Sequence, residues 1–256
     1  MKNLFLLLLS ISYTSLIGQQ YTSDLYISQK DTLPYRILLP KDFDAKKSYP
    51  LLLVLHGAGE RGNDNEAQLV HGSYLFVSEK FRDQHPAIVV FPQCPTDSFW
   101  AKIKVENKDE GGYEFTFSSV LPENRQLEIV EELLDFLHKK YRIEANRRYV
   151  GGLSMGGMGT FELVSRNPDY FAAAFPICGG GNPAWASLLS KTPLWIFHGE
   201  KDQVVPVECS IVMHRALKEI NAPVKLTLYP KVNHDSWNNA FEDPNLMHWL
   251  FSHTKK

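Results

Sequence analysis

The chain has 256 residues, of which 44% are hydrophobic and 22% are charged, and its formal net charge is -2. This length is enough to bury one large core and is typical of a single α/β domain. The near-neutral charge argues against nucleic-acid binding, which needs a basic stripe to neutralise phosphates. We therefore expect a small or locally recognised substrate and no nucleic-acid partner.

The first eighteen residues have the pattern of a secretory signal peptide. Lys2 supplies a short positive region, Leu4 to Leu9 form an apolar region, and Gly18 offers a small residue for cleavage. The apolar stretch is short and Ser-rich for a membrane span, so a retained anchor is the less favoured alternative. We predict export to the periplasm or the medium without stable membrane insertion, and a single mature domain over residues 19–256.

The three cysteines, Cys94, Cys178 and Cys209, match no zinc or redox motif. An exported domain of this size does not need a disulfide, so all three are compatible with small buried residues. The sequence leaves open a bridge between Cys94 and Cys178 or between Cys178 and Cys209. It implies no metal and no cofactor, and it does not indicate the oligomeric state.

In chain order, residues 25–39 predict an antiparallel edge hairpin that turns at residues 29–31. Short apolar runs then predict strands buried on both faces of a parallel sheet, and an alternating run predicts a strand nearer the edge. The apolar runs are 51–55, 87–91, 148–150 and 194–197, and the alternating run is 224–229. Helical patterns lie between them at residues 127–137, 155–166 and 207–220. This alternation predicts a mostly parallel sheet covered by helices on both faces.

The segment from Asp97 to Val120 fits neither pattern. It is rich in charged, glycine and aromatic residues, and it shows no sustained period. Long loops inside compact domains commonly serve as lids or binding loops. This segment leaves the carboxyl edge of the sheet, where α/β proteins bind ligands, so we predict a lid-like or substrate loop.

A serine lies between a predicted strand and a predicted helix in Gly152-Leu153-Ser154-Met155-Gly156. A Gly-x-Ser-x-Gly motif in this context is typical of a nucleophile on a strained turn. The glycines let neighbouring backbone pass closely, and the following helix N-terminus favours developing negative charge. Ser154 is therefore the predicted nucleophile.

A serine hydroxyl needs a base that is oriented by an acid, and in this motif the chain order is Ser, acid, His. Asp202, in the loop after the fourth apolar run, is the predicted acid, and Glu200 is the alternative. His234 follows the last strand in a loop and is the predicted base. The other downstream histidines have better structural explanations: His198 is expected to support the acid loop, and His214, His248 and His253 lie on helices or in the tail.

An oxyanion hole needs two backbone N–H donors. Met155, directly after the nucleophile, is one candidate. The second is expected from the loop after the first apolar run, where Ala58 is preferred and Gly59 is the alternative. For His56 in the same loop we expect a holding role through hydrogen bonds, without proton transfer.

Together these motifs resemble a bacterial esterase family described as dienelactone-hydrolase-like or phospholipase/carboxylesterase-like, with members labelled predicted peptidases. They are also similar to feruloyl and acetyl-xylan carbohydrate esterases. The resemblance covers residues 34–250 and rests on segments 56–62, 91–95, 152–157, 176–181, 198–202 and 234–237. It implies the α/β-hydrolase fold and a serine triad. Residues 102–121 are longer than the family usually carries, which leaves the substrate preference undecided.

Substrate contacts are predicted from aromatic and polar residues near the motifs. Trp237, Trp100 and Trp185 would form an aromatic platform, and Gln93 would line the pocket; packing against the sheet is the alternative for each tryptophan. Glu60 and Arg61 would either contact a polar substrate or form an internal ion pair.

The sequence thus predicts an exported carboxylic-ester hydrolase that works through an acyl-enzyme. Acyl or feruloyl esters of polysaccharide, or small aryl and alkyl esters, are the expected substrates. A serine peptidase of the prolyl-oligopeptidase type and a non-catalytic binding protein are the alternatives.

Overall fold

The computed structural model describes residues 20–29, 31–107 and 113–255 of the chain. The predicted signal peptide, residues 1–18, lies outside the described residues. Within the described ranges, none of the helices combines the length and the apolar character needed to cross a membrane. No disulfide joins any of the three cysteines, so neither bridge left open by the sequence is present.

The strands are β1 (Thr22–Ile27), β2 (Thr32–Leu38), β3 (Tyr49–Leu55), β4 (Ile88–Pro92), β5 (Ile103–Asn107), β6 (Tyr113–Phe117), β7 (Ile143–Leu153), β8 (Ala173–Ile177), β9 (Leu194–Gly199) and β10 (Val224–Tyr229). The α-helices are α2 (Ser73–Val77), α3 (Glu79–Gln84), α4 (Arg125–Lys140), α5 (Met155–Arg166), α6 (Ala186–Leu189), α7 (Glu208–Glu219), α8 (Trp237–Glu242) and α9 (Leu246–Ser252). Three 3-10 turns complete the set: η1 (Ala58–Glu60), η2 (Ala67–Leu69) and η3 (Pro183–Trp185).

Eight of the described strands form one sheet in the order β1-β2-β4-β3-β7-β8-β9-β10, and β5 and β6 pair separately. β1 pairs antiparallel with β2, and β2 pairs antiparallel with β4. All further pairs, from β4 to β10, are parallel. The predicted mostly parallel sheet with an antiparallel N-terminal hairpin is confirmed.

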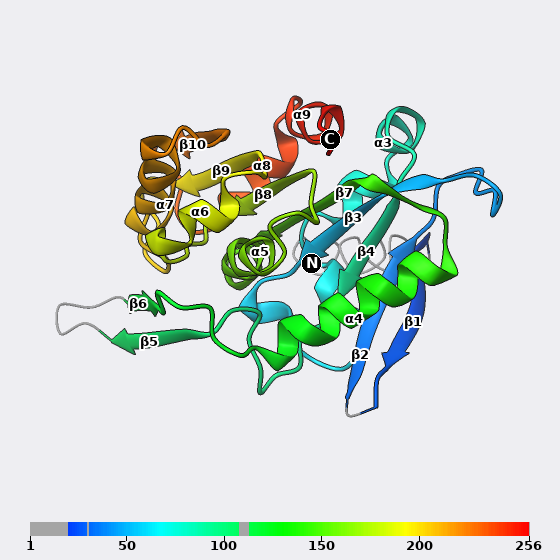
Figure 1. Ribbon diagram of the computed structural model, residues 1–256, viewed down its shortest axis with the longest axis horizontal. Helices are drawn as coiled ribbons and strands as arrows, with labels where there is room; N and C mark the ends of the chain where they lie inside the picture. Colours follow the sequence, from blue (N-terminus) through cyan, green and yellow to red (C-terminus); the bar gives the residue numbers. More distant parts are fainter. Residues whose placement is uncertain (1–19, 30, 108–112, 256) are drawn as a thin grey trace, which may run out of the picture.

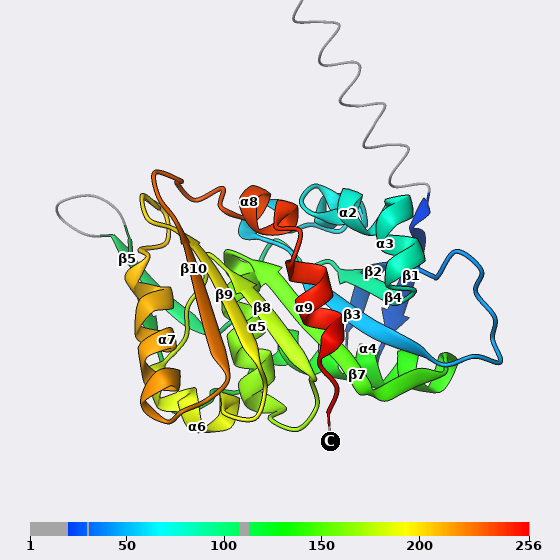
Figure 2. The same ribbon diagram turned by 90° about the horizontal axis from the view of Figure 1, so that it is seen from above.

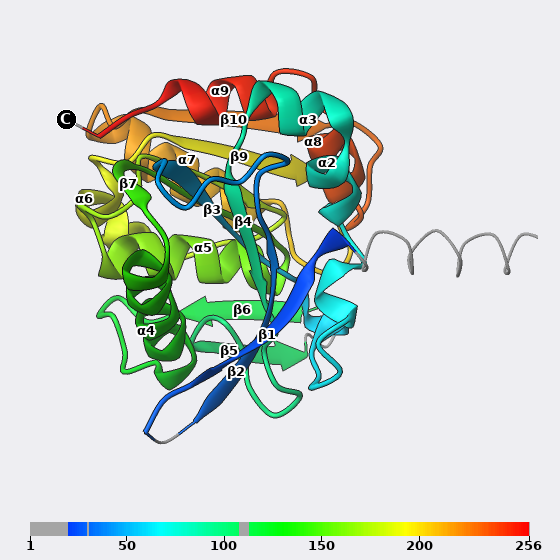
Figure 3. The ribbon, with the colours of Figure 1, turned by 90° about the vertical axis from the view of Figure 1, so that its right-hand side faces the viewer.

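Side chains of the central strands alternate between two cores because successive residues of a strand face opposite sides. In β3, Leu51, Leu53 and Leu55 pack with α4, α5, α6 and α7. Leu52 and Val54 pack on the other face with α2, α3, α8 and α9. Figures 2 and 3 show these two helical layers on opposite faces of the sheet. The predicted double covering of the sheet is therefore present.

One buried strand, β8, was missed by the sequence pattern. Its run Ala173-Ala174-Phe175-Pro176-Ile177 contains two alanines and a proline, which are uncommon in strands, so its local sequence favours no strand. It forms because it lies between β7 and β9 and is buried on both faces. Its position matters for the site, since the Ile177 carbonyl accepts a hydrogen bond of 2.9 Å from the Ser154 N–H.

Residues 97–120, predicted as a lid-like or substrate loop, contain two strands that the sequence pattern does not indicate. β5 and β6 pair there as an antiparallel ribbon outside the main sheet, and the ribbon projects from the body of the molecule (Figure 1). Each of the two strands has only five residues, so the segment shows no sustained period-2 pattern. Register pairs Ile103 with Phe117, and both pack near Met158 and Val205. Residues 108–112, which follow β5 in the sequence, lie outside the described part of the chain.

The base of this ribbon is tied to α5 by a buried carboxylate. Glu162 has no exposed surface and accepts hydrogen bonds from the Lys102 backbone N–H at 2.9 Å and from the Asn124 amide at 2.8 Å. Arg166 pairs with the same carboxylate at 3.0 Å. Buried charges are tolerated only when they are paired and hydrogen-bonded, as this one is. Glu162 thereby joins the ribbon, the start of α4 and the body of α5.

Replacing this carboxylate tests its importance for the fold. Glu162→Gln puts an amide among hydrogen-bond donors from three residues and leaves Arg166 without its counter-charge, so we expect the free energy of unfolding to fall by about 3 kcal/mol. Urea denaturation at pH 7 measures the change. Glu128→Gln, on the partly exposed face of α4, is the control, with an expected loss below about 1 kcal/mol. Equal losses for the two variants would contradict a special role for Glu162.

Candidate active site

Ser154 occupies the sharp turn between β7 and α5. Its backbone has φ 53° and ψ -117°, a region that non-glycine residues avoid at a cost of about 1–3 kcal/mol. The turn is possible because Gly152 and Gly156 lack side chains. A Cβ on Gly156 would lie 2.0 Å from the Leu55 carbonyl oxygen, and one on Gly152 would lie 2.6 Å from the same oxygen. The Gly-x-Ser-x-Gly pattern is thus explained by close backbone contact with the end of β3.

The structure brings the three predicted triad residues together from three different loops. The Ser154 Oγ lies 2.9 Å from the His234 Nε2, and the His234 Nδ1 lies 2.7 Å from the Asp202 Oδ2. The carboxylate accepts, so the His234 Nδ1 carries a proton and its Nε2 is left to accept from the Ser154 hydroxyl. Glu200, the alternative acid, has an exposed side chain and takes no part in these hydrogen bonds.

Asp202 is held as an anion in a buried position. Its Oδ1 accepts from the backbone N–H groups of Val204 and Val205 at 2.9 Å each. Its Oδ2 accepts from His234 and, at 3.1 Å, from the His198 Nε2. Burial raises the pKa of Asp202, but the hydrogen bonds from His198 and His234 outweigh it, and the pKa lies well below its usual range. The support that we expected His198 to give the acid loop is thus a direct hydrogen bond.

Both predicted oxyanion donors begin a helical turn. Met155 is the first residue of α5, and Ala58 is the first residue of η1, which follows Gly57. The first N–H groups of a helix have no partner within it and remain available to an incoming oxygen. A Cβ placed on Gly57 would lie 3.7 Å from the Ser154 Cβ, so the two turns meet beside the serine hydroxyl.

His56 fixes the direction of the Ala58 N–H. Its Nε2 accepts a 2.9 Å hydrogen bond from the Cys94 N–H, so its Nδ1 carries the proton and donates to the Gly57 carbonyl at 2.7 Å. The Gly57 carbonyl and the Ala58 N–H belong to one planar trans peptide and point in opposite directions. Holding the carbonyl therefore aims the N–H away from the imidazole. Burial lowers the pKa of His56 to about 4, so it stays neutral in this role.

Two of the predicted substrate contacts, Trp100 and Gln93, hold the oxyanion loop instead. Trp100 has no exposed surface, and its Nε1 donates to the His56 carbonyl at 3.1 Å. Gln93 is equally buried; its amide donates to Asp64 at 2.7 Å and accepts from the Asn65 N–H at 2.7 Å. Their prediction as substrate contacts is wrong, because their polar groups are used to satisfy loop backbone.

Trp185 does not contact substrate either. It is 1% exposed in η3, packs edge-on with Phe117 of the ribbon, and belongs to the core beneath α5 and α6. The alternative considered for it, packing against the sheet layer, is the correct one.

Trp237 remains next to the triad and is partly exposed. Its ring meets the His234 imidazole edge-on, with centroids 5.3 Å apart. Its other neighbour is His71, at 5.0 Å, whose Nε2 lies 3.5 Å from a Glu60 carboxylate oxygen. The internal partner of Glu60 is thus His71 rather than Arg61. Nothing in the local sequence around His71 indicates its contacts with Glu60 and Trp237, because they depend on how η1, α2 and α8 meet.

Arg61 also holds the loop. Its guanidinium donates to the carbonyls of Ala58 at 2.9 Å, Thr96 at 3.1 Å and Ser98 at 3.2 Å. It thereby joins the oxyanion turn to the segment after β4. The conformation of the Ala58 peptide is consequently fixed from both sides, by His56 and by Arg61.

One group in the described chain has ligand atoms close enough for a metal ion. Atoms of Cys178, Asp202 and His234 lie within 4.8 Å of one another. Two of these residues already form the triad hydrogen bond, which an ion would displace. Burial raises the pKa of the Cys178 thiol far above its usual range and keeps it protonated. The donor set is therefore better suited to proton transfer than to holding a metal.

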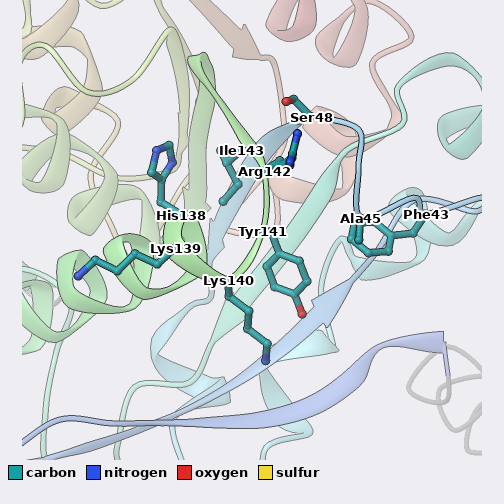
Figure 4. A pocket seen from close by; sticks show the side chains of 9 residues that line it. All are labelled: Phe43, Ala45, Ser48, His138, Lys139, Lys140, Tyr141, Arg142 and Ile143. Carbon is teal, nitrogen blue, oxygen red and sulfur yellow. The ribbon is translucent and has the colours of Figure 1, made fainter.

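Figure 4 shows a surface pocket at the opposite end of the sheet, where α4 ends and β7 begins. Its basic residues, including Lys139 and Lys140, belong to the last turn of α4 and complement the carbonyl end of that helix. Lys140 is paired with Asp24 at 3.0 Å. Ser154 follows the other end of β7, so this pocket is separate from the triad.

A model of the Esterase family matches residues 28–210. The chain belongs to this family. A bifunctional acetylxylan esterase/xylanase from Neocallimastix patriciarum is 31% identical over 158 residues, which are 61% of this chain and 20% of that protein. An acylamino-acid-releasing enzyme from Rattus norvegicus is 39% identical over 85% of this chain and 33% of its own length. The chain thus spans a third or less of these two relatives.

Solved structures give the same picture of the fold. A thermostable esterase superposes with a TM-score of 0.83 and 35% identity, covering 93% of this chain and 64% of that one. A ferulic acid esterase has a TM-score of 0.67 at 18% identity, covering 91% of this chain and 97% of that one. The resemblance to esterases inferred from the motifs is confirmed, and so is the α/β-hydrolase fold.

The pKa of His56 predicts how acid affects the esterase fold. The folded state disfavours the charged imidazole, whereas the unfolded chain takes up the proton near pH 6.5. As pH falls from about 6.5 to about 4, unfolding is therefore favoured by up to about 3 kcal/mol from this residue. NMR of the imidazole nitrogens should show a neutral, Nδ1-protonated ring down to about pH 4. Titration near pH 6.5 in the folded protein would contradict the holding role.

Trp100 offers a second test. Trp100→Phe removes the hydrogen bond to the His56 carbonyl but keeps an aromatic ring, so we expect kcat on an ester to fall about tenfold while KM changes less than twofold. Trp185→Phe is the matched control, since the Trp185 Nε1 is buried in the described chain without a hydrogen-bond partner; its kcat should not change. A rise in KM alone for Trp100→Phe would instead indicate a substrate contact.

Proposed function

We propose that this member of the Esterase family is an exported serine carboxylic-ester hydrolase that acts through an acyl-enzyme. The observation that carries the proposal is the unbroken hydrogen-bond chain from Asp202 through His234 to Ser154, on a strained turn at the start of a helix. Strain of this kind persists where the surrounding structure enforces it and is concentrated at functional sites.

The geometry supports a two-step mechanism. The Ser154 Oγ attacks the ester carbonyl carbon while the His234 Nε2 takes the hydroxyl proton, and Asp202 stabilises the imidazolium that forms. The N–H groups of Ala58 and Met155 hold the tetrahedral oxyanion. When the intermediate collapses, the C–O bond to the alcohol breaks and His234 gives its proton to the leaving oxygen.

The acyl-enzyme is then hydrolysed by the same groups. His234 takes a proton from a water molecule, whose oxygen attacks the acyl carbon, and the oxyanion forms again in the same hole. Collapse breaks the bond to the Ser154 Oγ, which recovers its proton from His234 and releases the acid. Every proton that leaves Ser154 or water thus passes through one imidazole nitrogen.

For the substrate we propose acyl or feruloyl esters of polysaccharide, with small aryl and alkyl esters also accepted. Support comes from the similarity to an acetylxylan esterase/xylanase and from Trp237, which lies beside the triad. We propose that residues 1–18 direct export, which would bring the enzyme to such a polymer. The β5–β6 ribbon would serve as the substrate-covering segment, since it packs near Val205 of the acid loop.

A peptidase is the second candidate, because acylamino-acid-releasing enzymes are among the relatives. The triad chemistry is the same, but an amine is a poorer leaving group than an alcohol. A panel of acetylated xylan, methyl ferulate and aminoacyl nitroanilides separates the two. Turnover of the anilides without turnover of the esters would favour the peptidase.

Removing the nucleophile tests the mechanism and the alternative of a non-catalytic binding protein. Ser154→Ala should lower kcat/KM for 4-nitrophenyl acetate at least about a thousandfold, because neither His234 nor the oxyanion hole can replace the attacking oxygen. A fluorophosphonate probe should label the wild type at Ser154 and leave the variant unlabelled. Ser187→Ala, at an exposed serine on α6, is the control and should behave as the wild type. Equal rates for wild type and Ser154→Ala would overturn the mechanism.

A further inference from the structure

Three side chains beside the triad have no role in the mechanism above. They are Glu60 at the end of η1, His71 before α2 and Trp237 at the start of α8. The ring of Trp237 contacts the imidazoles of both His71 and His234. Figure 2 shows α2 and α8 next to each other at the carboxyl end of the strands, and a Cβ on Gly72, beside His71, would touch the ring of Phe241 in α8.

The position of Trp237 indicates which portion of the ester it would contact. The proton on the His234 Nε2 must reach the leaving alcohol oxygen, so the alcohol lies beside this imidazole in the reacting complex. Trp237 packs edge-on against the same ring and is partly exposed. Its indole therefore flanks the alcohol portion of the ester rather than the acyl portion.

Glu60 approaches the same place from the oxyanion turn. One oxygen lies 3.5 Å from the His71 Nε2, and the other lies 2.9 Å from the point that a Cβ on Gly57 would occupy. That point is 3.7 Å from the Ser154 Cβ. The side chain of Glu60 keeps 13% of its surface exposed. Burial raises the pKa of Glu60, but the hydrogen bond and the charge interaction with His71, together with the contributions of His56 and the Gly57 N–H, outweigh it and lower the pKa below its usual value.

Glu60 retains capacity for a ligand after its internal contacts are made. A carboxylate accepts at about four lone-pair positions, and His71 and the Gly57 N–H are its neighbours within the protein. Tethering of the oxyanion turn is already achieved by Arg61 and His56. A carboxylate that only accepts hydrogen bonds, near a partly exposed indole, suits a ring that carries hydroxyl donors and an apolar face.

We propose that Glu60, His71 and Trp237 form a subsite for a sugar or other polyol as the alcohol portion of the ester. This inference rests on the proposed ester hydrolysis at Ser154. The C–H face of the sugar packs on the Trp237 indole, and its hydroxyls donate to the Glu60 carboxylate, whose position His71 sets. These residues would then determine which alcohol the enzyme releases.

A cationic alcohol such as choline also suits an indole and a carboxylate. The reaction argues against it, because the His234 imidazole becomes positively charged in each transition state. A cation held on Trp237 would then lie near a second positive charge, on His234. A neutral polyol avoids this repulsion and still gains charge-assisted hydrogen bonds from Glu60.

Esters that share one acyl group test the subsite. We would compare kcat/KM for an acetylated methyl xyloside, 4-nitrophenyl acetate and acetylcholine, since all three give the same acetyl-enzyme. Glu60→Gln and Trp237→Leu should each lower the ratio of xyloside to nitrophenyl activity about tenfold, and Trp237→Phe should restore part of it. Glu66→Gln, an exposed acid in the neighbouring segment, is the control and should leave the ratio unchanged.

A binding measurement separates this proposal from the proposed function. The acetylated xyloside should bind the Ser154→Ala variant, and Glu60→Gln in that background should weaken binding about tenfold, as measured by calorimetry. If the wild type hydrolyses no ester but this difference in binding persists, ester hydrolysis is overturned and the subsite stands. If the variants lose activity equally on all three esters, or if acetylcholine is preferred and that preference depends on Glu60, the polyol subsite is overturned.

Discussion

The backbone contact between the end of β3 and the turn after β7 is the constraint on which the site depends. The Leu55 carbonyl lies where any side chain on Gly152 or Gly156 would be. This approach sets the strained backbone of Ser154 and also brings the oxyanion turn, which continues from β3, beside the serine. A single close contact thus places both the nucleophile and one of the donors that stabilise its product. Adding a methyl group at either glycine would separate them.

The segments around this contact are held in place by hydrogen bonds between buried polar groups. Residues 56–65 are fastened to residues 91–98 by the Cys94 N–H, by Gln93 and by Arg61. Asp202 is fixed in the same manner by two backbone N–H groups and two imidazoles. Fully satisfied buried polar networks specify one arrangement, whereas unsatisfied ones are costly. The resulting rigidity means that the hole and the acid are in place before substrate arrives.

Sequence patterns predicted the elements that carry their own local signal. The apolar runs of β3, β4 and β9, the amphipathic α4 and the glycine-flanked Ser154 are of this kind, and each lies where it was expected. β8 has alanines and a proline and becomes a strand only through its neighbours, so it was missed. The ribbon of β5 and β6 was missed because each strand is short and pairs with the other alone.

The predicted substrate contacts, unlike the triad, depend on parts of the fold that carry no local sequence signal. A triad follows from chain order and loop position, but exposure of an aromatic ring depends on what the rest of the fold places around it. Trp100 and Trp185 are buried because they pack in the same core as the apolar side chains of α5 and α6. Trp237 stays partly exposed because it begins the short helix α8, directly after the loop that carries His234. His71 contacts Trp237 there, and Glu60 contacts His71, although both come from a distant part of the sequence. Selection among alcohols would thus depend on contacts between distant segments, while the bond-breaking chemistry depends on motifs that are local.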